Sequence, residues 1–158
     1  MANLDVNIIN PFIESTDNLF SVMMNMSVTR GIPFIREDTK NSFYYISGII
    51  GLAGDASGCV VVSFPLNVAL RVVSKFVGED AKEMNEEVKD AIGEVVNIIA
   101  GGAKKGLAEK GYVFKLSIPT VVTGNDHEIS RSSDIPCIVI PFDTTVGRFV
   151  VEVSLKKN

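Results

Sequence analysis

Apolar side chains recur at helical spacing near the start of the chain, and they predict a first helix that runs to about Ser27. Asn10 is a candidate N-cap and Pro11 suits the first helical position, where its missing N–H is harmless. The spacing of three and four residues is that of an amphipathic helix. Its predicted apolar face consists of Phe12, Thr16, Leu19, Phe20 and Met23.

Runs rich in Ile, Val, Phe and Tyr, bounded by turn residues, predict the strands. We expect strands at 31–37, 43–53, 112–123, 136–142 and 147–155. Gly-Asp-Ala-Ser-Gly at 54–58 predicts a turn into a further strand that begins at Cys59, which makes a β-hairpin. The last two strands are expected to form a second hairpin around a turn at Asp143 to Gly147, preceded by a polar loop at 124–135.

Two more helices are predicted in the middle of the chain, one from Pro65 to about Phe76 and a long one from about Asn85 to Lys110. Gly111 is expected to close the long helix. Its apolar face consists of Val88, Ile92, Val95, Val96, Ile99 and Leu107. The basic residues that suit the negative end of its dipole are Lys104, Lys105 and Lys110.

An internal repeat is visible when the two halves are compared. Gly-Ile-Pro-Phe at 31–34 matches Gly-Tyr-Val-Phe at 111–114, and the same offset places Glu14 on Glu94 and Asp17 on Asn97. Each half reads helix, strand, hairpin, so we expect one domain, 1–158, with repeats at about 10–64 and 85–155. This pattern predicts an α+β fold with a mostly antiparallel sheet and the long helices on one face. A doubly wound α/β fold is disfavoured because short hairpins cannot join parallel strands.

Charge and composition narrow the function. The 158 residues carry a net charge of −4, which argues against a nucleic-acid or membrane-surface partner. The first residues lack the features of a signal peptide, so a cytoplasmic location is expected. Cys59 and Cys137 are expected to be reduced thiols, and His127, the single histidine, to lie in a solvated loop.

One face of the long predicted helix carries a polar stripe opposite its apolar residues, formed by Asp90, Glu94, Asn97 and Gly101. Glu94 and Asn97 stand three residues apart and can reach one small target together. Such a pair often serves solubility alone. Asn and Gly, however, are poor helix formers, and a glycine in the stripe would let another backbone approach closely. Alternatively, Gly101 and Gly102 end or kink the helix.

The segment Asp90-Ala-Ile-Gly-Glu94-Val-Val-Asn97 and the opening Ile-Asn-Pro-Phe-Ile-Glu at 9–14 resemble the CheC/CheX/FliY chemotaxis phosphatases, and the CheX branch most. Pro119 stands one residue short of the spacing expected for the family's proline. The resemblance implies hydrolysis of the aspartyl phosphate of a CheY-type response regulator in two-component signalling. Asn97 would position the attacking water and Glu94 would pair with the partner's lysine.

The resemblance also implies features outside the catalytic pair. Asp90 and Gly101 would contact the partner, and this chain would bind no cofactor, because Mg²⁺ is held by the regulator. A homodimer is expected, with the strand at Phe149 to Val153 as a candidate pairing edge. The first copy of the motif, Glu14 and Asp17, is degenerate, because an ionised carboxylate repels a phosphoryl group and cannot donate a hydrogen bond.

Two other readings remain open. The first is a non-catalytic module, either regulator-binding or a flagellar-switch adaptor, that docks through the same helix. The second is an enzyme acting on a small molecule, which is disfavoured because the sequence shows no nucleophile, metal set or phosphate-binding glycine loop.

Overall fold

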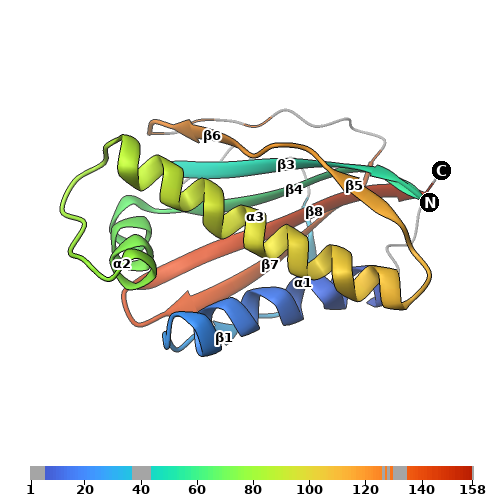
Figure 1. The fold of residues 1–158 in the computed structure, drawn as a ribbon, viewed down its shortest axis with the longest axis horizontal. Helices are drawn as coiled ribbons and strands as arrows, with labels where there is room; N and C mark the ends of the chain where they lie inside the picture. The colour runs from blue at the N-terminus through green and yellow to red at the C-terminus, as the bar shows by residue number, and fades with distance from the viewer. Residues whose placement is uncertain (1–5, 37–43, 126, 128, 130–134, 158) are drawn as a thin grey trace.

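The described strands of the computed structural model pair antiparallel in one sheet, and the described α-helices pack against it (Figure 1). The structure describes residues 6–36, 44–125, 127, 129 and 135–157. The elements in chain order are α1 (Val6–Asn18), the π-helix η1 (Leu19–Met23), β1 (Thr29–Arg30), β2 (Phe34–Ile35), β3 (Ile46–Gly54), β4 (Ala56–Phe64), α2 (Leu66–Val77), α3 (Glu86–Glu109), β5 (Phe114–Leu116), β6 (Thr120–Thr123), β7 (Cys137–Thr144) and β8 (Gly147–Lys157).

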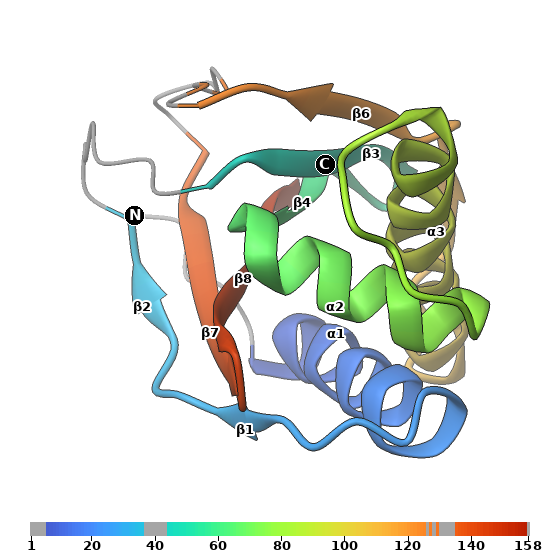
Figure 2. The same ribbon diagram turned by 90° about the vertical axis from the view of Figure 1, so that its left-hand side faces the viewer.

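The sheet order is β1-β7-β8-β4-β3-β5, with β2 also pairing with β7 and β6 with β3. Figure 2 shows the sheet curving around α1, α2 and α3, which all lie on one of its faces. This arrangement confirms the predicted α+β class and excludes the doubly wound alternative. None of the described helices is long and apolar enough to cross a membrane.

The two edges of the sheet are built in the same way: the short strands that follow a long helix pair with the outer strand of the other half's hairpin. The strands that follow α1 pair with β7, the outer strand of the second hairpin. The strands that follow α3 pair with β3, the outer strand of the first hairpin. Two halves of helix, strand and hairpin would produce such an order, with β4 and β8 meeting at the centre. The repeat at 10–64 and 85–155 itself stays a prediction.

The predicted start of the first helix is wrong, because α1 begins at Val6 and contains Pro11. A proline inside a helix leaves the carbonyl four residues earlier without its N–H donor. That carbonyl belongs to Asn7, and it accepts a hydrogen bond from Lys110 Nζ at 3.3 Å. The proline ring packs at Gly106 of α3, where an added Cβ would lie 3.2 Å from it. Contacts with α3 therefore accommodate Pro11 within the helix.

The end of this helix also differs from the prediction. A π-helical turn follows Asn18, and the Met24 N–H bonds to the Leu19 carbonyl, five residues back, at 3.0 Å. The wider turn changes which methionine faces the core. Met23 is 59% exposed, whereas Met24 is 5% exposed. The rest of the predicted face, from Phe12 to Phe20, is buried as expected.

Several strand bounds need correction. Within the segment predicted as one strand at 31–37, only the short strand β2 forms, and β1 lies just before this segment. The last residue of the segment, and the first residue of the strand predicted at 43–53, lie outside the described residues. The segment at 112–123 is divided into β5 and β6 by Ser117 to Pro119. The first hairpin connection is a single residue, Asp55, so that Gly58 lies within β4. The polar loop at 124–135 lies only partly within the described residues.

The predicted pairing edge at Phe149 to Val153 is also wrong. These residues belong to β8, which is hydrogen-bonded to β7 on one side and to β4 on the other. A strand paired on both sides has no free edge to offer a second chain.

The long helix matches its prediction closely. α3 is capped by Asn85, whose side chain accepts a hydrogen bond from the Val88 N–H at 2.9 Å. Such a cap contributes about 1 kcal/mol. Gly111, with a φ of 90°, follows the helix as expected. The last turn of α3 contains no basic residue, so Lys104 and Lys105 lie before the end that they were predicted to stabilise.

Candidate functional site

The outer face of α3 carries the predicted polar stripe. Asp90, Glu94 and Asn97 are exposed, and Gly101 is half-buried. α3 crosses over the sheet, so that its outer face points away from the protein (Figure 1). The structure therefore brings the four predicted residues together on one accessible surface.

The opposite face of α3 anchors the stripe. The buried residues of the helix are Val88, Ala91, Ile92, Gly93, Val95, Val96, Ile99, Ala100, Ala103 and Leu107. Each large aliphatic side chain among them contributes about 1.5–3 kcal/mol of burial energy. Since buried residues stand on both sides of Glu94 and next to Asn97, the backbone that carries the pair is held firmly against the sheet.

Two neighbouring segments flank the stripe. On one side, an added Cβ at Gly93 would lie 3.5 Å from Val121 and 3.9 Å from Pro119, so this part of β6 and the turn before it lie beside Glu94. On the other side, α1 contacts α3 through Ser15, whose Oγ donates to the Ile99 carbonyl at 2.8 Å. The stripe is the part of α3 left open between these flanks.

Gly101 and Gly102 differ sharply in their surroundings. An added Cβ at Gly102 would lie 2.3 Å from Ser15 Oγ, so the contact between α1 and α3 requires a glycine there. An added Cβ at Gly101 would have nothing within 4 Å. The helix continues through both positions to Glu109, which excludes the alternative that they end it. No packing contact within the described chain explains why Gly101 is a glycine.

The charged groups of the stripe are available to an external partner. Glu94 and Asp90 form neither a side-chain hydrogen bond nor an ion pair with any residue that the structure describes, whereas Lys89 pairs with Glu86 at 3.1 Å. An exposed carboxylate of this kind can accept a bond from an incoming lysine without first breaking an internal one.

The first copy of the motif has a different environment. On α1, Glu14 is exposed but Asp17 is half-buried. Burial raises the pKa of Asp17, while the charge of Arg30 acts in the opposite direction. Asp17 is therefore less accessible than Asn97 and carries a carboxyl group in place of an amide.

The remaining candidates lie on the other face of the sheet. Cys59 and Cys137 are not joined in a disulfide, as expected. The prediction of a solvated loop for His127 is wrong, because its ring is half-buried, with Nε2 2.6 Å from Ser47 Oγ and Nδ1 2.9 Å from the Gly124 carbonyl oxygen. His127 joins Gly124 to β3 and takes no part in the stripe on α3.

Residues 46–143 match the family model of the chemotaxis phosphatase CheX. The chain belongs to this family. A relative from Thermotoga maritima, named CheY-P phosphatase CheX, is 28% identical over 127 residues, which cover 80% of this chain and 81% of that protein. The match confirms the expectation of a phosphatase of the CheX branch.

Solved structures agree with the assignment. A CheC-like superfamily protein from Shewanella sp. PV-4 superposes with a TM-score of 0.90 at 34% identity, covering 97% of this chain and 99% of that one. CheX from Borrelia burgdorferi, solved as a complex with CheY, BeF3 and Mg²⁺, superposes with a TM-score of 0.81 at 26% identity, covering 98% of this chain and 100% of that one. The CheX fold therefore extends over nearly the whole chain.

Sequence reasoning missed how the flanks of the stripe are built. It identified Pro119 from its distance along the chain, but not its position beside Gly93. It assigned no role to Ser15, which lies between the two repeat-matched residues of α1 and bonds to α3. No local signal could have revealed either contact, since each joins residues far apart in the chain.

Proposed function

We propose that this chain hydrolyses the aspartyl phosphate of a CheY-type response regulator, with α3 entering the regulator's phosphorylation site. The observation that carries the proposal is the exposed Glu94 and Asn97 on a helix whose other face is fully anchored. A CheX relative of the same fold forms a complex with CheY, BeF3 and Mg²⁺, which supports a partner of this kind.

Asn97 positions the attacking water. Its amide offers a donor and an acceptor, so it can hold a water in line with the bond between phosphorus and the aspartyl oxygen. The water attacks phosphorus, the aspartate leaves as a carboxylate, and inorganic phosphate is released. Phosphoryl transfer needs little covalent help from the protein, so orientation supplies the acceleration.

Glu94 anchors the helix in the partner. Its exposed carboxylate pairs with the lysine that contacts the phosphoryl group in the regulator, one turn from Asn97. Asp90 adds a contact at the rim of the interface, and Gly101 allows the partner's backbone to approach the helix. The regulator supplies the Mg²⁺ that neutralises charge on the phosphoryl group, and this chain contributes no cofactor.

The test measures phosphate release from a phosphorylated regulator by the native chain and two variants. Asn97→Ala should lower kcat by a factor of about 100 or more, as loss of a water-positioning group does. Glu94→Ala should mainly raise KM, so that a high regulator concentration partly restores the rate. Lys82→Ala, which changes an exposed residue before α3, is the control and should match the native chain. Unchanged turnover in Asn97→Ala would refute the role of the amide.

A non-catalytic binding module makes the opposite prediction. It would form a stable complex with the phosphorylated regulator, and the rate of phosphate loss from that complex would equal the rate from the regulator alone. The same assay, run with a pull-down of the complex, separates the two functions.

We also propose a cytoplasmic homodimer whose subunits meet at β2. Among the described strands, β2 pairs only with β7, and its side chains Phe34 and Ile35 are exposed, as is the nearby Ile32. An edge strand with exposed apolar groups can pair with a second copy. Light scattering should give a dimer for the native chain and a monomer for Phe34→Lys. A native monomer at high concentration would exclude the dimer.

A further inference from the structure

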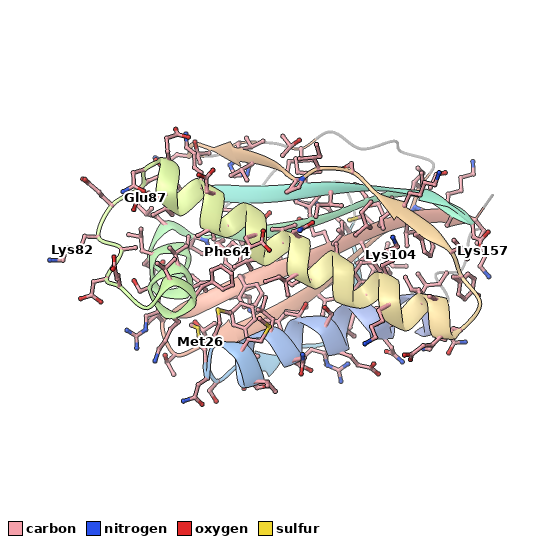
Figure 3. The ribbon with its side chains drawn as sticks, in the orientation of Figure 1. Met26, Phe64, Lys82, Glu87, Lys104 and Lys157 are labelled. Carbon is pink, nitrogen blue, oxygen red and sulfur yellow. The ribbon has the colours of Figure 1, made fainter. Side chains whose placement is uncertain are left out.

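The charges along α3 are unevenly distributed. The first half of the helix carries four carboxylates, Glu86, Glu87, Asp90 and Glu94, against the single lysine Lys89. After Asn97, the first charged residues of the helix are Lys104 and Lys105. Lys104 stands seven residues after Asn97, about two turns or roughly 10.5 Å along the same side of the helix. Figure 3 shows Lys104 on the side of α3 that is nearer β5.

Lys104 has no evident role within the folded chain. It is exposed and forms no ion pair with any described residue. The positions three and four residues away hold Ala100, Gly101, Leu107 and Ala108, none of which is acidic. It also lies before the last turn of α3, where a positive charge gains little from the helix dipole. Lys105, by comparison, stands four residues before Glu109.

The proposed function places a strongly negative group opposite Asn97, about two turns of α3 from Lys104. A phosphoryl group carries about −1.5 to −2 charges at neutral pH, and carboxylates hold the Mg²⁺ beside it. This chain has a net charge of −4, and Asp90 and Glu94 add local negative charge to the same stripe. A cation that follows Asn97 along the stripe offsets this negative charge and attracts an acidic partner.

We propose that Lys104 is a positioning residue, which binds an acidic group at the rim of the regulator's phosphorylation site and holds Asn97 over the phosphoryl group. Gly101 lies between Asn97 and Lys104 with open space around it, so the partner can approach the helix between the two side chains. Glu94 then binds a basic group on one side of Asn97 and Lys104 an acidic group on the other. This inference rests on the proposed function.

The experiment compares initial rates of phosphate release for the native chain, Lys104→Ala, Lys104→Arg, Lys104→Glu and Lys82→Glu over a range of regulator concentrations and ionic strengths. Lys82→Glu makes the same charge change in the segment before α3. Figure 3 shows Lys82 at one end of the molecule, away from Lys104. Lys104→Ala should lower kcat/KM about threefold and Lys104→Glu about tenfold, both through KM, and both deficits should shrink at high salt. Lys104→Arg should retain the native rate.

The outcomes separate this inference from the function on which it rests. If the native chain releases no phosphate, the proposed function fails. If the native chain is active and Lys104→Glu has the same KM and salt dependence, Lys104 does not position the partner. If Lys82→Glu loses as much as Lys104→Glu, net charge alone explains the effect and the specific role is overturned. A fall in kcat at saturating regulator, with KM unchanged, would also contradict a positioning role.

Discussion

Replacing Gly101 by alanine should make the protein more stable and less active. Gly101 lies inside α3, where glycine costs about 1 kcal/mol relative to alanine. Because an added Cβ would meet nothing within 4 Å, the substitution recovers this free energy without strain. For a domain of this size, about 1 kcal/mol corresponds to a rise of roughly 2–4 °C in Tm.

The same Cβ should interfere with the regulator. If the partner's backbone lies against Gly101, the extra methyl group overpacks the interface at a cost of about 1–3 kcal/mol. That cost corresponds to a loss of roughly five- to 150-fold in kcat/KM. Thermal unfolding followed by circular dichroism gives the first quantity, and phosphate release from the phosphorylated regulator gives the second.

Gly102→Ala is the matched control, one residue further along the same helix. Its Cβ would lie 2.3 Å from Ser15 Oγ and 3.0 Å from Ser15 Cβ, so the Ser15 side chain must leave its hydrogen bond to Ile99 or the two helices must separate slightly. We expect a net loss of about 1 kcal/mol or more. A stabilised Gly101→Ala protein with native activity would show that no partner approaches this glycine. A destabilised Gly101→Ala protein would refute the account of the open space around it.

Three further predictions concern buried or half-buried polar groups. Burial raises the pKa of Asp17 above 3.8 despite the charge of Arg30, so the native chain loses stability as the pH rises through the raised pKa. In urea unfolding, Asp17→Asn should be more stable than the native chain at pH 7 and equally stable at pH 3. A variant that is less stable than the native chain at pH 7 would contradict this sign. Ser154 Oγ is buried without a hydrogen-bond partner among the described residues, so Ser154→Ala should be neutral or stabilising by up to about 1 kcal/mol. Glu152 is also buried on β8 and pairs with Arg36. Glu152→Ala should therefore lower the free energy of unfolding by about 3 kcal/mol in the same assay. Equal effects of Ser154→Ala and Glu152→Ala would argue against a stabilising ion pair.

Elements whose signals are local could be predicted from the sequence. α2 and α3 follow a proline and a capping asparagine and end before glycines, and periodic apolar residues continue through both. The two hairpins were predictable because short turns join apolar runs. The polar stripe of α3 followed from the same periodicity, since residues three or four apart share a face.

Elements that depend on distant contacts could not be predicted in this way. Pro11 suggested a helix start because, taken alone, it costs a helix interior about 3 kcal/mol. In the folded chain, Lys110 bonds to the Asn7 carbonyl and Gly106 leaves room for the ring, so the helix extends back to Val6. Nothing in the sequence of β8 shows that β4 and β7 occupy both of its sides, so the sequence wrongly predicts an edge there.

The two repeat-matched pairs explain why the proposed activity belongs to α3 alone. When the two halves are aligned, Glu14 of α1 corresponds to Glu94 of α3, and Asp17 to Asn97. The second position therefore carries a carboxylate on α1 and an amide on α3. Asp17 is half-buried, whereas Asn97 is exposed. α1 also uses Ser15, between Glu14 and Asp17, to contact α3. That contact turns part of the α1 stripe toward its neighbour and leaves the outer face of α3 open. Both the chemistry and the packing therefore favour a single proposed site in each chain, centred on Asn97.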